Sequence, residues 1–346
     1  DFKELSLFEH LEQAIDAKVS NLELLPQLKG DSRYYRRKAR LTVRVVKKKG
    51  GALVGFREKY GSFITDMKSC HVLVKEVADL IPSLRTLITE LEGRQVIPQI
   101  EVAVGEYKDQ DNLRENSQAL NKVALVIRHL KPLSKTDLQT LCDFAQEWSI
   151  ELYLQPKSIE SVHKIHPKQT VERLQYFLAD FDLALNFHPM DFVQVNADIN
   201  RQLVKRAIRL LDLNKEDRVL DLFCGLGNFT LAIARYCREV VGVEGNDEMV
   251  KRGKENALLN NISNAKFYRE NLSKNIENKP WLSLHFSKIL IDPPRSGAIE
   301  ILKQIANLQA ERIIYISCNL VTLARDTALL VAEGYRLKSC GVVDMF

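Results

Sequence analysis

The sequence predicts an α/β protein in which a smaller α+β domain precedes a doubly wound parallel sheet. In the second half of the chain, short apolar runs alternate with stretches of helical periodicity, a pattern typical of parallel strands joined by helices. A glycine turn follows the first of these runs, and an acidic residue ends the second. Side chains at the carboxyl ends of parallel strands gather at one edge of the sheet, so we expect the functional site there.

The stretch Arg218-Val-Leu-Asp-Leu-Phe-Cys-Gly-Leu-Gly-Asn-Phe-Thr230 has the pattern of a buried strand, a tight turn and a helix that starts near Asn228. Gly225 and Gly227 allow the backbone to turn beside a ligand. Glu244 follows Gly225 by nineteen residues, a spacing at which a carboxylate can accept both ribose hydroxyls of a nucleoside cofactor. The third glycine of the dinucleotide fingerprint is missing. This favours a cofactor without a pyrophosphate, S-adenosylmethionine, over a dinucleotide. A purely structural turn is the alternative interpretation.

The composition describes an ordinary two-domain protein, with 45% hydrophobic and 27% charged residues among 346. No apolar run approaches the roughly 18 residues of a membrane span, and the first residues have no basic, apolar leader. We therefore expect a cytoplasmic protein without a membrane partner. The six cysteines have no paired spacing, which indicates reduced thiols rather than a disulfide framework.

Positive charge is concentrated between residues 31 and 60. This window has eleven Lys or Arg and two acidic residues, a net charge of 11 − 2 = +9, whereas the whole chain has only +5. The basic residues alternate with strand-forming ones, and a strand would place Arg40 and Arg44 on one face. Such a surface suits phosphates and unstacked bases. We therefore favour a nucleic-acid-binding surface over an ordinary solvent-exposed one. The charge alone does not distinguish RNA from DNA.

The pattern divides the chain into three parts. Residues 1–30 are expected to form one amphipathic helix with Phe8, Leu11, Ile15, Val19 and Leu22 on its apolar face, packed on the rest. Residues 31–186 are expected to form the α+β domain, and residues 187–346 the parallel-sheet domain. Within the α+β domain we expect strands at 99–104, 123–130, 150–155 and 174–178, and helices at 72–91 and 134–148, the latter capped by Ser134.

Four side chains are expected at strand ends of the parallel sheet: Glu244, Asn271, Asp292 and Cys318. Asp292 is followed by two prolines, which would hold its loop still, although it could simply cap a turn. Cys318 directly precedes a helix expected from Leu320, and a helix N-terminus favours thiolate over thiol. The alternative is that Cys318 is a buried cysteine, which is usually an inert small hydrophobe. Cys224, the rival thiol, lies inside the glycine turn, where packing explains it.

A methyl donor, a thiol and a nucleic-acid surface together suggest methylation of a pyrimidine carbon. A thiolate can add to C6 of uracil and make C5 nucleophilic, and a base must then remove the C5 proton. Methylation of an exocyclic amine fits less well, because Arg295 stands where those enzymes have an aromatic side chain. Cytosine methylation fits less well because Asp292-Pro-Pro-Arg295 contains no cysteine.

Several motifs resemble those of the bacterial RNA uracil-5-methyltransferases, and in particular those that act on 23S ribosomal RNA. They are Asp191-Phe-Val-Gln-Val-Asn196, Asp221-Leu-Phe-Cys-Gly-Leu-Gly-Asn-Phe229, Asp292-Pro-Pro-Arg-Ser-Gly297, Ser317-Cys-Asn319 and Thr322-Leu-Ala-Arg-Asp326. The resemblance implies a Rossmann-like methyltransferase sheet and a central RNA-binding domain. It implies that Cys318 is the nucleophile and that S-adenosylmethionine is bound by Gln194, Phe223, Asn228, Glu244, Asn271 and Asp292. It places Arg36, Arg37, Arg40, Phe56 and Arg57 against RNA. We expect 23S rRNA as the partner, no binding of DNA, and a monomeric enzyme.

The resemblance also implies features that the printed sequence does not contain. Members of this kind have an N-terminal OB-like TRAM domain and a [4Fe-4S] cluster held by four cysteines. Cys70 matches the fourth of these, so we expect a cluster only if three cysteines precede this sequence. The base is expected to be a Glu after Phe346, without which turnover would not be completed. A transfer RNA substrate, or a non-catalytic RNA-binding protein on a methyltransferase fold, are the alternatives.

Overall fold

A computed structural model describes residues 2–15, 22–61, 63–107, 120–168, 173–274, 276 and 279–346. The chain forms two compact units. The parallel-sheet unit comprises Asp1–Gly30, Leu178–Leu185 and Ile199–Met345, and the mixed-sheet unit comprises Asp31–Phe177 and Asn186–Asp198. Residues 1–30 thus group with the parallel sheet, and the stretch after the expected boundary at 187 groups with the mixed sheet up to residue 198.

The parallel-sheet unit is built on five strands in the order β12 (Ala265–Arg269), β11 (Glu239–Glu244), β10 (Arg218–Leu222), β13 (Lys288–Ile291) and β14 (Arg312–Tyr315). All neighbours are parallel. The chain leaves β10 in one direction and returns to its other side with β13, so the strand order reverses between these two strands. In such sheets ligands bind outside this switch point. The predicted doubly wound α/β fold is confirmed.

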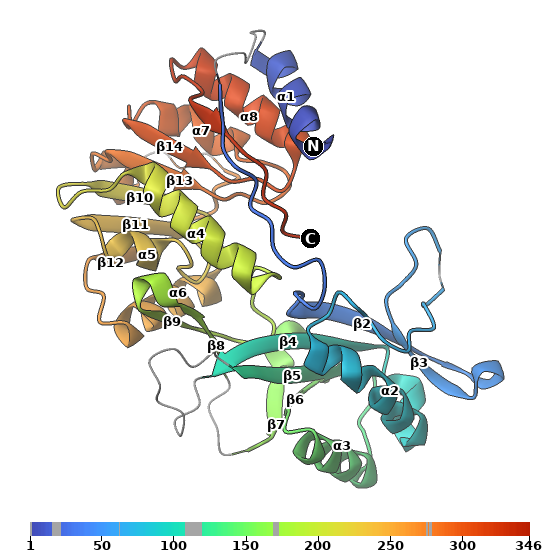
Figure 1. Ribbon diagram of the computed structural model, residues 1–346. Coiled ribbons are helices and arrows are strands. Elements are labelled where there is room, and N and C mark those ends of the chain that lie inside the picture. The colour runs from blue at the N-terminus through green and yellow to red at the C-terminus, as the bar shows by residue number, and fades with distance from the viewer. Residues whose placement is uncertain are drawn as a thin grey trace. The chain divides into compact units, whose positions relative to one another are not determined.

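Helices cover this sheet (Figure 1). They are α4 (Ala197–Leu211), α5 (Thr230–Ala234), α6 (Asp247–Leu259), α7 (Ile299–Ala306) and α8 (Leu320–Ala332). Helix α1 (Phe2–Ile15) packs against α8, and the unit also contains the 3-10 helices η4 (Ala179–Phe181) and η5 (Pro280–Ser283). Residues of β10, β11 and β13 form the centre of the core, together with the buried Trp281 and Phe286. The apolar runs that predicted the strands are therefore the runs that fill the core.

The mixed-sheet unit has six strands in the order β3 (Gly51–Gly55), β2 (Lys38–Val46), β4 (Gln99–Tyr107), β5 (Leu120–Arg128), β6 (Glu151–Gln155) and β7 (His163–His166). Only β5 and β6 pair in parallel, and α3 (Lys135–Glu147) connects them. The other elements are α2 (Lys75–Glu90), η1 (Lys47–Lys49), η2 (Glu92–Val96) and η3 (Ile159–Ser161). Ser134 caps α3 by accepting a hydrogen bond from the amide of Asp137, as predicted.

A hairpin of β8 (Leu174–Leu178) and β9 (Leu183–Phe187) contributes residues to both units. Among the described residues, no helix combines the length and the apolar character needed to cross a lipid bilayer.

The expectation of one helix through most of residues 1–30 was wrong. Helix α1 ends at Ile15, and Val19 lies outside the described residues. Glu23–Leu24 forms β1, which pairs in parallel with β15 (Ser339–Cys340). The amide of Leu25 donates to the carbonyl of Cys340 at 2.8 Å, so the backbone finds its partners in a distant segment instead of in a helix. Periodicity within one segment does not reveal such a partner.

Candidate active site

The glycine turn after β10 has the left-handed backbone that its sequence predicts. Gly225 has φ +55° and Gly227 has φ +97°, and Phe223, a non-glycine residue, has φ +62°. The amides of Phe223 and Cys224 both donate to the carbonyl of Val243 on β11, at 2.9 and 3.2 Å. The turn is therefore fixed to the neighbouring strand, and its strained conformation at Phe223 is typical of a ligand-binding loop.

Glu244 lies at the end of β11, directly beside this turn. One carboxylate oxygen accepts from the amide of Gly225 at 3.1 Å and the other from the amide of Asn246 at 2.9 Å. The side chain is half-buried. A carboxylate has about four acceptor positions, so two bonds to backbone amides hold Glu244 in place and leave capacity for two hydroxyl groups. This geometry fits the ribose of S-adenosylmethionine.

Two further carboxyl groups lie where β10 and β13 meet the switch point. Asp221 on β10 is fully buried, and burial raises its pKa to about 7. One of its oxygens bonds the hydroxyl of Thr230 at 2.5 Å, whereas the other is buried without a hydrogen-bond partner. Asp292 follows β13, its amide donates to Leu222 on β10, and burial raises its pKa to about 7 as well. Two carboxyl groups with raised pKa values at a switch point are a pattern found at functional sites.

Asp221 and Asn200, which were not predicted as site residues, lie beside the glycine turn. An acidic residue inside an otherwise apolar strand was the available signal for Asp221. Asn200 on α4 is buried, and its amide group exchanges two hydrogen bonds of 3.0 Å with that of Asn228. Asn228 is thus oriented by α4. A polar residue on the buried face of an amphipathic helix was the signal for Asn200.

The structure brings five of the six predicted cofactor residues to the same edge of the parallel sheet: Phe223, Asn228, Glu244, Asn271 and Asp292. Asn271 is exposed in the loop after β12, and its side chain accepts from the amide of Ser273. Gln194 belongs to the mixed-sheet unit, where its carbonyl accepts from Arg37 Nε at 2.8 Å. The roles of all six residues stay predictions.

Cys318 is exposed between β14 and α8, and helix α8 begins at Leu320 as predicted. The chain here lies against the end of β13, because the amide of Ile316 donates to the carbonyl of Ile291 at 2.8 Å. Asn319 caps α8 through the amide of Val321 and also donates to the carbonyl of Arg295, in the Asp292 loop, at 3.0 Å. An accessible thiol therefore stands beside the loop that carries Asp292.

Cys224, the rival thiol, has the properties of a packing residue. It is buried, and burial raises its pKa well above the ordinary value of a thiol. A Cβ atom at Gly242 would lie 2.9 Å from its sulfur, so β11 has a glycine where Cys224 fits. A protonated, enclosed thiol is a poor nucleophile, which favours Cys318.

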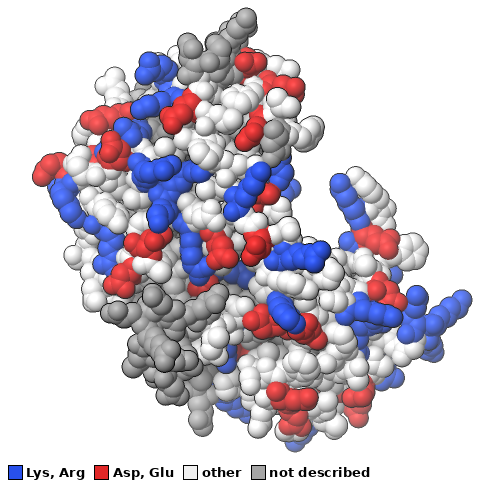
Figure 2. Space-filling view, in the orientation of Figure 1, with Lys and Arg blue, Asp and Glu red and all other residues white. Residues whose placement is uncertain are grey.

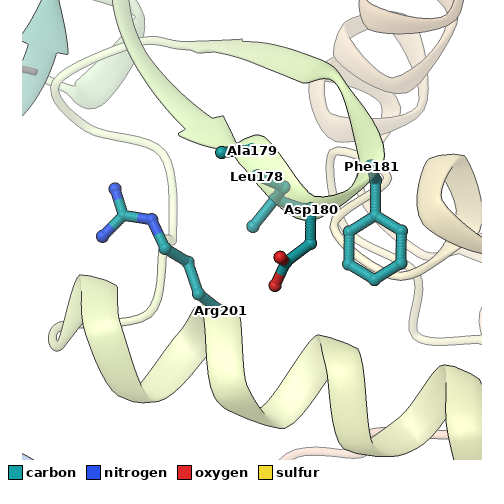
Figure 3. Close-up of a pocket in the computed structure, with 5 residues that line it drawn as sticks. All are labelled: Leu178, Ala179, Asp180, Phe181 and Arg201. Carbon is teal, nitrogen blue, oxygen red and sulfur yellow. The ribbon is translucent and has the colours of Figure 1, made fainter. Parts of the chain in front are cut away.

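A separate pocket in the same unit contains none of the predicted residues. It lies between η4 and α4 and is lined by Leu178, Ala179, Asp180, Phe181 and Arg201 (Figure 3). Figure 3 shows the carboxylate of Asp180 directed toward α4, where it forms an exposed ion pair with Lys205 at 3.3 Å. This depression has no group suited to the chemistry above.

The residues predicted to face RNA have different surroundings in the mixed-sheet unit. Arg40 and Arg57 are exposed, and Arg40 forms an ion pair with Glu101 at 2.5 Å. Arg36 is half-buried and donates to the carbonyl of Lys38, and Phe56 packs against the core. Figure 2 shows Lys and Arg side chains at the end of the β2–β3 hairpin, where η1 consists of three lysines.

The expectation that Arg37 lies on this surface was wrong. Its residue is 3% exposed, and its guanidinium lies 4.7 Å from the ring centre of Tyr176. On β2 and the residues that lead into it, neighbouring side chains point to opposite faces, so Arg37 enters the interior. It is a structural residue that joins the segment before β2 to Gln194.

Cys70 is half-buried and packs against the hydrophobic core of the mixed-sheet unit. Over the described ranges of the chain, no group of three or more His, Cys, Asp or Glu could hold a metal ion. The residues present do not fit a four-cysteine cluster, and a role of Cys70 as ligand stays a prediction.

The parallel sheet with its switch point at β10, the glycine turn and the carboxylate at the end of β11 define a Rossmann-like methyltransferase of the S-adenosylmethionine-dependent class. The tRNA (Uracil-5-)-methyltransferase family matches residues 116–346. The chain is 46% identical over 349 residues to the 23S rRNA (uracil(1939)-C(5))-methyltransferase RlmD of Hahella chejuensis, covering 99% of this chain and 74% of that protein. The protein of the same name from Alcanivorax borkumensis is 47% identical over 324 residues, 94% of this chain and 70% of the relative.

Among solved structures, the tRNA (uracil-54, C5)-methyltransferase of Pyrococcus abyssi in complex with S-adenosyl-L-homocysteine aligns with a TM-score of 0.69. It is 21% identical and covers 99% of this chain and 80% of that one, which shows a shared fold. The chain belongs to the RNA uracil-5-methyltransferase family.

Proposed function

We propose that the protein methylates C5 of a uridine in 23S ribosomal RNA with S-adenosylmethionine as the methyl donor. The observation that carries the proposal is the exposed thiol of Cys318 at the end of β14, fixed beside the loop of Asp292. The thiol lies at the same sheet edge as Glu244 and Asp292, which supports a role for Cys318 as the nucleophile beside a bound cofactor. A cytoplasmic location is part of the proposal, because its substrate is ribosomal.

Each group has a distinct role in this proposal. Cys318 Sγ adds to C6 of the uracil, and the charge that develops at C5 and O4 makes C5 nucleophilic. When bound, S-adenosylmethionine supplies an electrophilic methyl group. Glu244 would hold its ribose, and the carboxyl groups of Asp221 and Asp292 favour its positive charge. After loss of the C5 proton to a base, the C6–sulfur bond breaks and Cys318 is regenerated.

Sequence identity to the relatives favours ribosomal RNA over transfer RNA as the substrate. The relatives at 46% and 47% identity are named for 23S rRNA, whereas the solved structure named for tRNA is 21% identical. The family description itself names tRNA, so both RNAs belong in the test.

The test uses 5-fluorouridine, whose fluorine cannot leave as a proton does and therefore stalls the covalent complex. The protein is incubated with S-adenosylmethionine and a fluorinated 23S rRNA fragment or tRNA, and adducts are separated on a denaturing gel. We expect an adduct with the 23S fragment that is lost in Cys318→Ala and kept in Cys224→Ala. An adduct formed only with tRNA would replace the substrate, and RNA binding without any adduct would favour a non-catalytic RNA-binding protein.

A further inference from the structure

Asp326, on α8, binds the end of β14 and the end of the Asp292 loop, and also its neighbour Arg325. It is fully buried, and one of its oxygens accepts from the amide of Ala298 at 2.7 Å and from the hydroxyl of Tyr315 at 2.5 Å. Its other oxygen accepts from Arg325 Nε at 2.8 Å. Tyr315 ends β14, three residues before Cys318, and Ala298 ends the loop that begins with Asp292. One carboxylate therefore connects the strand of the thiol to the Asp292 loop.

The same loop is held along its length by the first turns of α8. Arg325 Nη2 donates to the carbonyl of Ser296 at 2.9 Å. Asn319 Nδ2 and Thr322 Oγ1 donate to the carbonyl of Arg295, at 3.0 and 3.3 Å. The backbone of residues 295, 296 and 298 is thus bound from one helix, the helix that Cys318 immediately precedes.

The loop has a glycine where this contact is closest. Gly297 has φ +82°, and a Cβ atom there would lie 2.4 Å from Arg325 Nη2 and 2.5 Å from Asp326 Oδ2. Burial, with the neighbouring carboxylate of Asp326 as partner, raises the pKa of Tyr315, so the phenol stays a hydrogen-bond donor. The loop and the helix are thus packed so closely that a single added methyl group would collide with Arg325 and Asp326. Such close packing is expected where the distance between the Asp292 loop and the Cys318 turn is fixed.

We propose that Asp326 and Arg325 are positioning residues that lock the Asp292 loop against the turn of Cys318. The inference rests on the proposed function, in which the thiol and the cofactor must reach opposite sides of one pyrimidine double bond. Reacting atoms need separations near 3 to 3.5 Å, and a displacement of about 1 Å can cost roughly a hundredfold in rate. The two residues touch neither RNA nor cofactor in this role and act through the backbone they hold.

The experiment compares Asp326→Asn with Asp217→Asn in the full chain. Asp217 is a matched control, because it is also a buried carboxylate with three kinds of partner: the amide of Asn214, the hydroxyl of Ser287 and Lys288 Nζ. It lies next to the first residues of β10 and β13, at the opposite end of the strands. Both variants are assayed at a temperature at which circular dichroism shows them folded.

We expect Asp326→Asn to slow adduct formation with fluorinated RNA by about 10- to 100-fold at saturating RNA and cofactor, with KM for RNA and the Kd for S-adenosylmethionine changed less than about threefold. Asp217→Asn should change the rate less than about threefold. Arg325→Lys keeps the charge but loses the planar guanidinium group. It should slow adduct formation by an amount between those of Asp217→Asn and Asp326→Asn. Equal losses in Asp326→Asn and Asp217→Asn, or an unchanged rate in Asp326→Asn, would overturn the proposal.

Hydrogen exchange provides a readout that does not depend on the proposed function. In Asp326→Asn, amides in peptides covering 295–299 and 317–323 should exchange at least about tenfold faster, whereas in Asp217→Asn they should not. If the unsubstituted protein forms no adduct, the proposed function fails, yet this exchange still tests the lock. Unchanged exchange at 295–299 in Asp326→Asn contradicts it.

Discussion

Asp221 combines full burial, one short bond to Thr230 and one oxygen without a hydrogen-bond partner. Its pKa of about 7 comes first from desolvation, and the nearby carboxylates of Asp292 and Glu244 raise it further. Two carboxyl groups that titrate near neutrality at a switch point are typical of sites that bind charged ligands.

The raised pKa predicts how stability depends on pH. The folded protein binds the proton of Asp221 more tightly than the unfolded chain, so this contribution is complete below pH 4 and is lost as the pH rises toward about 7. Between pH 5 and pH 8, the free energy of unfolding should fall by about 2 to 3 kcal/mol more in the unsubstituted protein than in Asp221→Asn. Urea unfolding at the two pH values measures this. A difference that stays constant or grows with pH would contradict it.

Gly297 makes a second prediction for a single residue. Gly297→Ala should lower the free energy of unfolding by about 2 to 4 kcal/mol, because a left-handed backbone and a collision with Arg325 act together. Gly334→Ala is the control, since Gly334 has φ +96° with nothing within 4 Å of a Cβ atom. It should cost only about 1 kcal/mol. If urea unfolding shows equal losses of unfolding free energy in Gly297→Ala and Gly334→Ala, the Arg325 side chain moves aside without a measurable loss of stability, and the prediction is wrong.

Among the elements, α3 tests whether a cap recognised in the sequence stabilises the folded helix. Ser134→Ala removes the acceptor of the Asp137 amide and should lower the free energy of unfolding by about 1 kcal/mol. Gln146→Ala, an exposed change in the same helix, should change it by less than about 0.5 kcal/mol. The midpoint of urea unfolding compares them, and a larger effect of Gln146→Ala would refute the assignment.

Helix α8 serves two purposes in this architecture. Its apolar face packs in the sheet core through Leu330, while its first turns hold the loop of Asp292 through polar side chains. The helix is therefore both a cover for the sheet and part of the site. This dual use explains why Asp326 is fully buried although a charged side chain is normally kept near water.

For the whole molecule, the relevant property is the concentration of +9 in thirty residues of a chain with net charge +5. Replacing Lys47 and Lys48, both exposed in η1, with Gln should weaken RNA binding. It should also make the slope of log affinity against log salt less steep by about 1.4 to 1.8, because two phosphate contacts are lost. The same change at the exposed Lys251 and Lys254 is the control. Filter binding at several salt concentrations measures both, and equal slopes in the two variants would remove η1 from the RNA surface.

The sequence alone determined that the sheet is parallel and doubly wound, that a glycine turn follows β10, that α8 starts at Leu320, and that Cys318 is the candidate thiol. These features depend on local periodicity and on the residues that tight turns and helix starts require. It could not show that Arg37 is buried, that residues 23–24 pair with 339–340, or that Asp221 titrates near neutrality. Those properties arise from contacts between segments far apart in the chain. Only the tertiary structure decided that Asp326, on α8, joins the end of β14 to Ala298 at the start of α7, because the hydrogen bonds that a buried carboxylate accepts depend on which donors the fold brings to it.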